Sequence, residues 1–473
     1  MLSAARSVVG GAVPVRTRAA EAFALSLRRW LARPEALLVA TVAILIAGGT
    51  AVLSLPAMHG PQPLGPLDAL FHATSAVCVT GLTTLPGGAA DLSRPGQIAL
   101  ITLVQLGGLG LLTFGAIAVQ FLRMPASLTS QAALQDVFFQ SEARGALQSA
   151  LRRVFLLVFV CEVVGALVLW RGLDRAGAGG GSAAAVRAIS AYCTPGFSVY
   201  DDSVVSLRHL PEAVITLMLL ITIGGLGYTV LFELLDRGWR RVRRRPGRTV
   251  CWSLHTRVVL AASAILTVGG AAVLLSTGLT TQEDTLGARL VHALFQSVTA
   301  RTAGFNSVHV VALPVPTLLI LCALMFVGGS PGSCAGGVKT TSVVAWLARL
   351  RARLLGREDV NIGGRHLPQE VVRRAALVIA IAALWNFAGV LILCTTEPVG
   401  QALGLEQLIF EQVSAFATVG LSTGITPELS PLGKLWIIAS MFVGRVGPLT
   451  VALAVVRRPR ARIAYPVERL MIG

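Results

Sequence analysis

The chain has 473 residues, of which 54% are hydrophobic and only 13% charged, and its formal net charge at pH 7 is +17. With a mean hydropathy of +0.73, this composition excludes a soluble globular protein and indicates a membrane protein. The seven cysteines are scattered singly, which excludes both a disulfide framework and the cysteine spacing of a zinc site.

Several apolar stretches are long enough to cross a bilayer, which takes about 20 helical residues. We identify eight and expect an all-α polytopic membrane protein with eight transmembrane helices. In chain order the stretches are 36–56, 97–121, 153–170, 211–235, 257–278, 314–345, 372–395 and 432–456.

Basic residues orient these spans. Of the 40 lysines and arginines, 30 fall in five alternate segments, 1–35, 122–153, 237–257, 346–374 and 457–473. Because positively charged loops stay on the cytoplasmic side, both termini are predicted to be cytoplasmic.

Two basic segments have a second interpretation. The Arg- and Ala-rich residues 1–35 have the composition of an organellar transit peptide as well as that of a cytoplasmic leader, which we favour. The arginine run from Arg237 to Arg248 is similar to a nucleic-acid-binding patch. Beside a membrane span, an anchor to anionic membrane lipids is the better interpretation, and we expect no nucleic-acid partner.

A pattern of long helix, short helix, polar loop and long helix occurs four times. Corresponding glycines stand at 81, 196, 304 and 420, with separations of 115, 108 and 116 residues. We therefore expect four parallel helix–pore-helix–filter–helix repeats around a pseudo-fourfold pore. The predicted organisation is a basic leader (1–35), repeat 1 (36–121), repeat 2 with its preceding linker (122–236), repeat 3 with an Arg-rich linker (237–345), repeat 4 with its linker (346–456) and a cytoplasmic tail (457–473).

The four loops have the chemistry of a selectivity filter. Non-helical backbone at membrane depth is tolerated only inside protein or around a water-filled cavity. Glycine turns carbonyls toward an axis without an intervening side chain, and rings of carbonyls replace the hydration shell of a monovalent cation. The predicted K⁺ filter residues are Val79, Thr80, Gly81, Thr194, Pro195, Gly196, Thr302, Ala303, Gly304, Thr418, Val419 and Gly420.

These loops, with four further motifs, resemble the Trk/Ktr/HKT superfamily of potassium transporters, and most of all the Ktr-type membrane subunit. The motifs are Gln105-Leu-Gly-Gly-Leu-Gly110, Ile223-Gly-Gly-Leu-Gly227, the glycine-rich stretch from Met325 to Thr341, and the stretch from Met441 to Thr450 with its Gly444-Arg-Val-Gly-Pro448 signature. The resemblance covers residues 36–456.

The resemblance implies a bacterial inner-membrane homodimer in which each protomer has its own gated pore. It also implies K⁺ selection by the four glycines, with a sodium-permeable or Na⁺/K⁺ cotransporting member as the alternative. A cytoplasmic ring of RCK-type subunits would regulate the gate, and nucleotide would bind only to that ring. Channel-like and sodium-coupled symport mechanisms both stay open.

The second loop departs from the family pattern at Pro195, next to Gly196. Proline has no backbone N–H, so one hydrogen bond that braces the loop is expected to be missing. The carbonyls of Thr194 and Pro195 remain as ligands.

The sixth span cannot be one regular helix, because residues 328–337 contain five glycines and a proline. In the resembled family this segment lies across the pore below the filter, close to the residue that corresponds to Arg445. The predicted gate residues are Gly328, Gly329, Ser330, Pro331, Gly332, Ser333, Gly336, Gly337, Lys339 and Arg445.

Two intramembrane cations need an explanation, since a charge in a span is costly. We expect Arg445 to donate hydrogen bonds to carbonyls of the gate and to repel cations; the alternative is snorkelling toward the cytoplasm. Lys339 is either part of the gate or a snorkelling side chain at a helix end. Its surroundings miss the phosphate-binding spacing G-x-x-x-x-G-K-[ST] by one residue, so we do not interpret them as a nucleotide site.

Charges also stand close to the filter loops. Arg301 and Glu411 are predicted to form a buried pair that braces adjacent loops, with direct cation contact by Glu411 as the alternative. Glu162 lies within the third span, and the sequence does not identify its partner.

Enzymes and scaffolds are the competing classes of function. The longest cytoplasmic gaps between spans are about 30 residues, which is too short for a soluble catalytic domain, and a scaffold has no need of four glycine loops. We therefore expect a transporter and not an enzyme.

Overall fold

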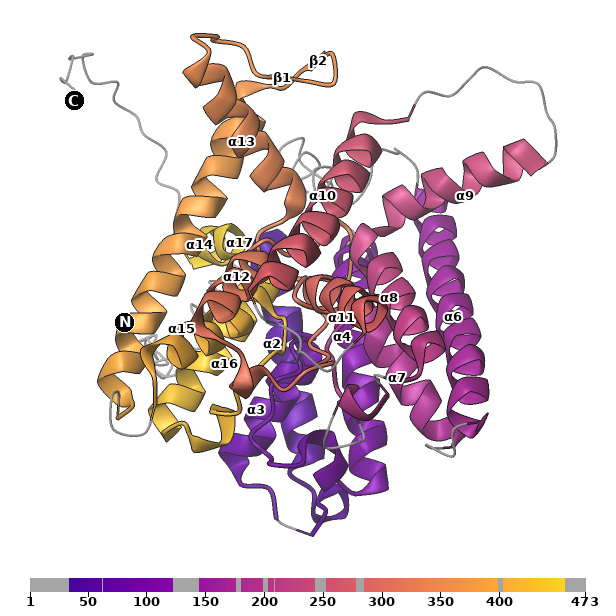
Figure 1. Cartoon of the computed structure of the whole chain (residues 1–473), viewed down its shortest axis with the longest axis vertical. Coiled ribbons are helices and arrows are strands. Elements are labelled where there is room, and N and C mark those ends of the chain that lie inside the picture. The colour runs from indigo at the N-terminus through magenta and orange to yellow at the C-terminus, as the bar shows by residue number, and fades with distance from the viewer. Residues whose placement is uncertain are drawn as a thin grey trace, which may run out of the picture.

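The computed structural model describes residues 34–61, 63–121, 144–175, 180–198, 203–207, 209–242, 252–277, 285–398 and 403–455 (Figure 1). Nearly all of the predicted leader (1–35), the whole predicted tail (457–473) and the linker residues 122–143 and 243–251 lie outside the described residues.

The helices that make up the predicted spans are mostly apolar, as a bilayer requires. They are α2 (Pro34–Leu53), α4 (Arg94–Phe121), α6 (Arg144–Arg175), α8 (Pro211–Leu226), α9 (Tyr228–Val242), α10 (Leu254–Ser276), α12 (Val315–Phe326), α13 (Thr340–Leu354), α14 (Gln369–Thr396), α16 (Pro431–Val446) and α17 (Pro448–Val455). The exceptions are α9 and α13, which carry several charged residues.

Four short helices lie inside the molecule, and each ends where a predicted filter loop begins. They are α3 (Pro66–Val77), α7 (Gly181–Cys193), α11 (Leu286–Thr299) and α15 (Leu405–Ala417). Their side chains make up much of the core, including the fully buried rings of Phe71, Phe295 and Phe416. The glycine loops therefore start from rigid, well-packed elements.

The remaining elements are small. Single 3₁₀ turns occur at η1 (Pro56–Met58), η2 (Gly88–Asp91), η3 (Val205–Leu207), η4 (Val310–Ala312) and η5 (Thr426–Glu428). An antiparallel hairpin of β1 (Asn361–Ile362) and β2 (Arg365–His366) joins α13 to α14. Figure 1 shows this hairpin projecting beyond the helices at the end of the molecule opposite to α3.

Within the described residues, four helical stretches are long and apolar enough to span a membrane: Glu35–Leu53, Leu151–Arg175, Leu254–Ser276 and Gln369–Thr396. Two bent pairs, α8 with α9 and α16 with α17, raise the number to six. Of the two other predicted spans, 97–121 lies within α4 and 314–345 contains the short apolar helix α12. Large apolar side chains on α6 such as Leu156 and Phe159 are more than 60% exposed, as expected of a surface that faces lipid.

Two spans that the sequence predicts as continuous are sharply bent. The axes of α8 and α9 meet at 107°, and those of α16 and α17 at 96°. Gly227 (φ 87°) and Gly447 (φ 95°) stand at the bends, in a backbone region that only glycine adopts readily. Pro448 also disfavours helical backbone at the residue before it.

The sixth span is interrupted, as predicted: α12 ends at Phe326 and α13 begins at Thr340. The two sides of the break meet at a parallel bridge between Val327 and Val338. The intervening glycine-rich residues therefore form a closed loop between two helices.

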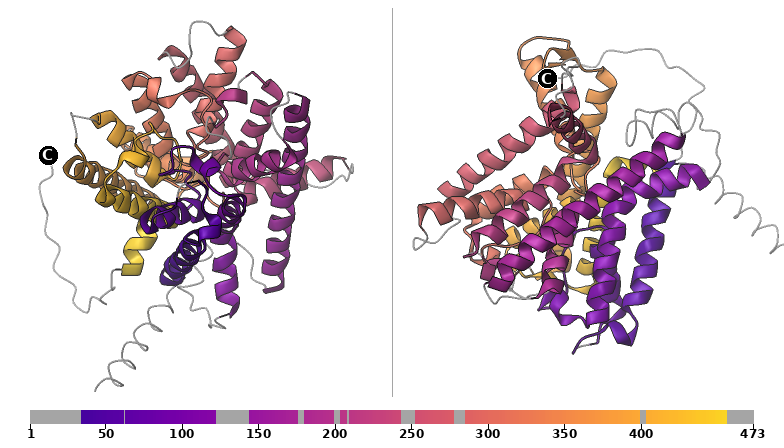
Figure 2. Two further views of the ribbon diagram at one scale, coloured as in Figure 1. Left: turned by 90° about the horizontal axis from the view of Figure 1, so that it is seen from below. Right: turned by 90° about the vertical axis from the view of Figure 1, so that its right-hand side faces the viewer.

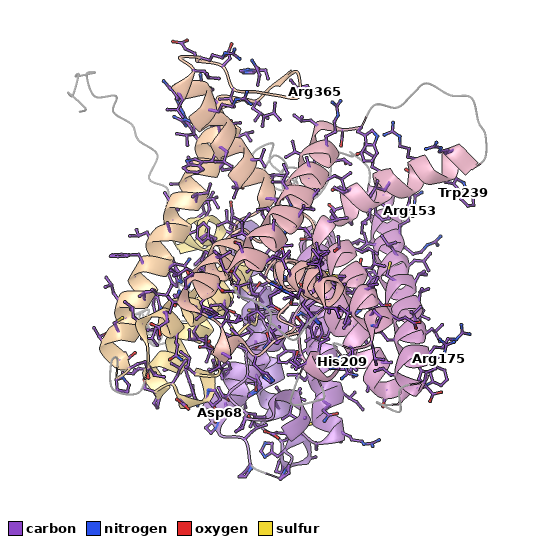
Figure 3. The ribbon with its side chains drawn as sticks, viewed as in Figure 1. Asp68, Arg153, Arg175, His209, Trp239 and Arg365 are labelled. Carbon is purple, nitrogen blue, oxygen red and sulfur yellow. The ribbon has the colours of Figure 1, made fainter. Side chains whose placement is uncertain are left out.

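The helices are arranged around a centre. In the left view of Figure 2, helices from successive parts of the chain occupy successive sectors. Helix α4 packs against α7, α8 against α11, α12 against α15, and α16 returns to α3, so that the last helices close onto the first. Figure 3 places Arg153 and Arg365, from two segments predicted to share one side of the membrane, toward one end, and Asp68 toward the other.

The bend at Gly227 gives a direct test. Gly227→Ala places a Cβ at positive φ and about 2.5 Å from the Pro331 carbonyl oxygen, and such strained residues cost roughly 1–3 kcal/mol. The control is Gly225→Ala in α8, where a Cβ meets nothing within 4 Å and alanine favours the helix. We expect a lower melting temperature for the first variant and an equal or higher one for the second, measured on detergent-purified protein by size-exclusion chromatography after heating. Equal melting temperatures of the two variants would show that the bend does not need glycine.

Candidate functional site: four glycine loops and a glycine-rich segment

All four predicted filter loops share one unusual backbone pattern. A non-glycine residue with positive φ stands two positions before each glycine, and the glycine itself has positive φ. The non-glycine residues are Val79 (56°), Thr194 (69°), Thr302 (80°) and Thr418 (51°), and the glycines are Gly81 (96°), Gly196 (78°), Gly304 (71°) and Gly420 (91°). Non-glycine residues persist in this region only where the surroundings hold them, and they cluster at functional sites.

The four glycines meet in a closed ring. A Cβ on Gly81 would overlap the Pro195 carbonyl oxygen of the second loop, and a Cβ on Gly196 would overlap the Ala303 oxygen of the third. In the same way Gly304 faces the Val419 oxygen, and Gly420 faces the Thr80 oxygen of the first loop. Each glycine thus lies against the carbonyl that precedes the next glycine in the ring, and any side chain at these positions would push the loops apart.

The ring opens on one side into a cavity of about 510 Å³ that all four glycines line. Ser422, Thr426 and Glu428 contribute to its wall. On the loops themselves, the buried hydroxyls of Thr194, Thr302 and Thr418 have no hydrogen-bond partner among the described residues. The site therefore offers a ring of carbonyls and free hydroxyls, which suit a dehydrated cation.

Hydroxyl groups on the short helices brace three of the loops. Ser75 Oγ accepts from Gly81 N (3.0 Å) and donates to the Leu82 carbonyl (2.7 Å). Ser414 Oγ accepts from Gly420 N (3.2 Å), and Thr299 Oγ1 donates to the Phe305 carbonyl (2.8 Å). Sequence reasoning assigned no role to these residues, although the signal was present as a hydroxyl residue five or six positions before each glycine.

The second loop lacks such a brace. Thr80 N donates to the Ser75 carbonyl (2.7 Å) and Val419 N to the Ser414 carbonyl (2.9 Å), but Pro195, at the corresponding position, has no N–H to donate. The Ser190 hydroxyl, which corresponds to that of Ser75, has no partner within the described chain. The backbone hydrogen bond that we expected Pro195 to remove is therefore missing from the second loop.

The glycine-rich segment between α12 and α13 is tied to several helices at once. Ser330 N donates to the Gly225 carbonyl (3.1 Å) and Cys334 N to the Gly224 carbonyl (3.3 Å), both at the end of α8. In return, Tyr228 N at the start of α9 donates to the Gly332 carbonyl (3.0 Å). The bend at Gly227 thus exposes backbone groups that hold this segment.

The same segment touches the base of a filter loop. A Cβ on Gly336 would overlap the Thr418 hydroxyl, and a Cβ on Gly337 would meet Ala417 at 3.4 Å. The predicted gate residues and the fourth predicted filter loop are therefore in contact.

Arg445 lies inside the protein and does not snorkel: it is only 4% exposed. Its guanidinium donates to the Cys334 carbonyl in the glycine-rich segment and to the Gly107 carbonyl of α4 (2.8 Å). The ammonium of Lys339 folds back onto the Ala335 carbonyl of the same segment. Both cations thus satisfy carbonyls that the broken helix leaves free.

The predicted pair of Arg301 and Glu411 is wrong. Arg301 donates to the Ser263 carbonyl (3.2 Å) and to the hydroxyls of Ser263 and Thr267, all on α10. Glu411 accepts from the hydroxyls of Ser422 (2.9 Å) and Thr426. Each charge therefore has its hydrogen-bond partners in nearby segments of the chain and not in the other charge.

The serine braces give a matched comparison. Ser75→Ala removes two hydrogen bonds and leaves Gly81 N without its acceptor, a change that costs roughly 1–3 kcal/mol for a buried group. Ser190→Ala removes a buried hydroxyl that has no partner in the described chain, so we expect little loss. Melting curves of both purified variants in KCl check this, and a larger destabilisation by Ser190→Ala would contradict it.

Comparison with known proteins agrees with this geometry. The TrkH family, described as cation transport protein, matches residues 34–464. The "Potassium/sodium uptake protein NtpJ" of Enterococcus hirae is 33% identical, with 93% of this chain and 97% of that protein covered. The "Ktr system potassium uptake protein B" of Bacillus subtilis is also 33% identical, covering 93% of this chain and 96% of that protein.

A solved structure shows the same fold. The potassium transporter TrkH from Vibrio parahaemolyticus superimposes with a TM-score of 0.68 at 19% identity, covering 88% of this chain and 83% of that one. The family match spans nearly all of the chain and the two relatives align over almost their full length. The chain therefore belongs to the TrkH family of cation transport proteins, which are transporters and not enzymes.

Proposed function

We propose that the chain is the translocation subunit of a potassium uptake system in the bacterial inner membrane. The observation that carries the proposal is the closed ring of four glycine loops on one cavity. The pairwise packing of α4 with α7, α8 with α11, α12 with α15 and α16 with α3 supports four parallel repeats around one pseudo-fourfold pore, with eight transmembrane segments.

Potassium is the proposed cargo because carbonyl rings replace the hydration shell of a weakly hydrated monovalent cation. Glycine at all four ring positions is the pattern that goes with potassium preference in this superfamily. A sodium-permeable or cotransporting activity is the second candidate, since one relative is named a potassium/sodium uptake protein and Pro195 leaves the second loop without its brace.

The glycine-rich segment 328–337 is the proposed gate. Its contact with Thr418 supports a position on the ion path below the filter. Arg445 and Lys339 both donate to its carbonyls, so two positive charges stand on the proposed path while the segment keeps this conformation. Ions would pass only after the segment moves and these bonds break.

Orientation and partners complete the proposal. The excess of basic residues in alternate segments supports cytoplasmic termini, on the side where the hairpin projects. The resemblance to Ktr-type subunits favours a homodimer and a cytoplasmic RCK-type ring that binds nucleotide. The basic cytoplasmic segments, including residues 457–473, are the proposed docking site of this ring. Light scattering of the purified protein would measure the number of subunits and so test the homodimer.

Potassium uptake is tested with Gly304→Ser in cells that lack their own potassium uptake systems. The wild-type chain should restore growth at limiting potassium and take up rubidium. A serine at position 304 would adopt a strained positive φ at a cost of roughly 1–3 kcal/mol and would overlap the Val419 carbonyl. We therefore expect uptake to fall about tenfold or to admit sodium.

The control for this experiment is Gly287→Ser, on an exposed turn of α11 where a Cβ meets nothing within 4 Å. Its uptake should match the wild type. If the wild type shows no uptake, co-expression with an RCK-type subunit separates a missing regulator from a wrong assignment of the loops.

The gate is tested with Arg445→Ala. Removing the guanidinium takes a charged donor from the Cys334 and Gly107 carbonyls, and hydrogen bonds to charged groups are worth roughly 1.5–3 kcal/mol. We expect the closed form to lose stability and rubidium uptake to rise about tenfold. Arg445→Lys, which keeps the charge but not both bonds, should lie between. Arg94→Ala, at the exposed start of α4, is the control and should take up rubidium like the wild type. Unchanged uptake in Arg445→Ala would contradict a role of Arg445 in gating.

A further inference from the structure

The second filter loop poses a question that the other three do not. Pro195 cannot donate the backbone hydrogen bond that Thr80 and Val419 make, and the Ser190 hydroxyl makes none within the described residues. Yet Thr194 keeps the same strained backbone, with φ 69°, as its counterparts. Strained conformations persist only where other contacts hold them, so this loop needs a further anchor besides the bond from Thr194 N to the Ser190 carbonyl (2.9 Å).

A buried carboxylate lies behind this loop. Glu162 of α6 is 6% exposed. Its Oε1 accepts from the thiol of Cys193 (3.6 Å), the last residue of α7. Its Oε2 accepts from Gln105 Nε2 (3.0 Å), and Gln105 Oε1 lies 3.3 Å from the same thiol, whose single proton the two acceptors share. Three side chains from three helices thus close a hydrogen-bonded triangle one residue before the strained Thr194.

The position of Glu162 carries a carboxylate in the second repeat alone, although Glu411 is another buried carboxylate, in the fourth repeat. Glu162 stands 34 residues before Gly196, and the residues at the same spacing before the other filter glycines are Ala47, Gly270 and Asn386. Of these three residues, only Asn386 is polar and buried. Its amide donates to the Ala382 carbonyl of its own helix (2.9 Å). The buried carboxylate therefore occurs in the repeat whose backbone brace proline has removed.

We propose that Glu162, with Gln105, is a positioning residue that anchors the second filter loop through Cys193 in place of the hydrogen bond that Pro195 removes, and thereby sets the discrimination between potassium and sodium. This inference rests on the proposed function. Because Gln105 belongs to α4, the anchor also joins the first and second quarters of the ring. A buried carboxylate in a membrane helix is costly and marks a functional position.

The first test compares Glu162→Leu, Glu162→Gln and Asn386→Leu. Discrimination is measured as the concentration of sodium needed to halve rubidium uptake. Loss of the anchor in Glu162→Leu should lower this concentration about tenfold, because it leaves the buried donors of Gln105 and Cys193 without this acceptor. Glutamine keeps an acceptor oxygen and should stay close to the wild type, and Asn386→Leu should match it. An unchanged value in Glu162→Leu overturns the proposal.

The second test restores the missing brace. Pro195→Val gives the loop an N–H like that of Val419, which donates to the Ser414 carbonyl. In this background Glu162→Leu should lower the halving concentration by less than about twofold, since the two anchors replace each other. An equal loss in both backgrounds means that Glu162 acts in some other way and overturns the proposal. A residue needed only for folding would show no such compensation.

A third measurement does not depend on the ion transported. Purified protein is treated with a methanethiosulfonate reagent, and modification of the buried Cys193 is followed by mass spectrometry. Glu162→Leu should raise the rate about tenfold, and Pro195→Val should reverse the rise. If the wild type does not discriminate between the two ions, the proposed function fails, and the modification rates alone decide the anchor. An unchanged modification rate in Glu162→Leu overturns the proposal that Glu162 anchors the second loop.

Discussion

The close approach of four backbone segments at the centre of the protein is the constraint on which the rest of the structure depends. Each filter glycine lies against a carbonyl oxygen of the next loop, at a distance that excludes a Cβ. Backbone at this depth has no bulk water to satisfy it. The short helices, their hydroxyl braces and the surrounding helices all hold these loops in place, with their carbonyls facing one another.

The bends at Gly227 and Gly447 and the break between α12 and α13 meet the same requirement. Each interruption leaves backbone carbonyl and N–H groups without partners in their own helix. Several of these groups form hydrogen bonds with groups freed at another interruption. The end of α8 and the start of α9 hold residues 330–334, while Arg445, near the bend at Gly447, reaches the same segment. Glycine at the bends thus allows close backbone contact. Through this contact the bend at Gly227 and the glycine-rich segment form hydrogen bonds to each other.

Buried charge follows the same logic. Arg301, Glu411, Glu162 and Arg445 lie in or near the membrane interior, where an unsatisfied charge is expensive. In each case carbonyls, hydroxyls or amides supply the partners, and the charge holds a segment that has lost regular backbone bonding or lies beside one. Glu162 illustrates this most clearly, because it stands beside the loop in which proline has removed a donor.

The sequence by itself determined the membrane class, the four glycine loops at near-equal spacing and the break in the sixth span. These follow from composition and from local backbone chemistry, since five glycines and a proline in ten residues cannot remain helical. Only the tertiary structure decided the bends at Gly227 and Gly447, because the similar glycine motif of residues 105–110 stays within the continuous helix α4. It also decided the partners of Arg301, Glu411 and Glu162, which belong to segments that meet only after folding. Sequence spacing shows which residues recur, but a hydrogen bond between α4, α6 and α7 depends on how the helices pack around the pore.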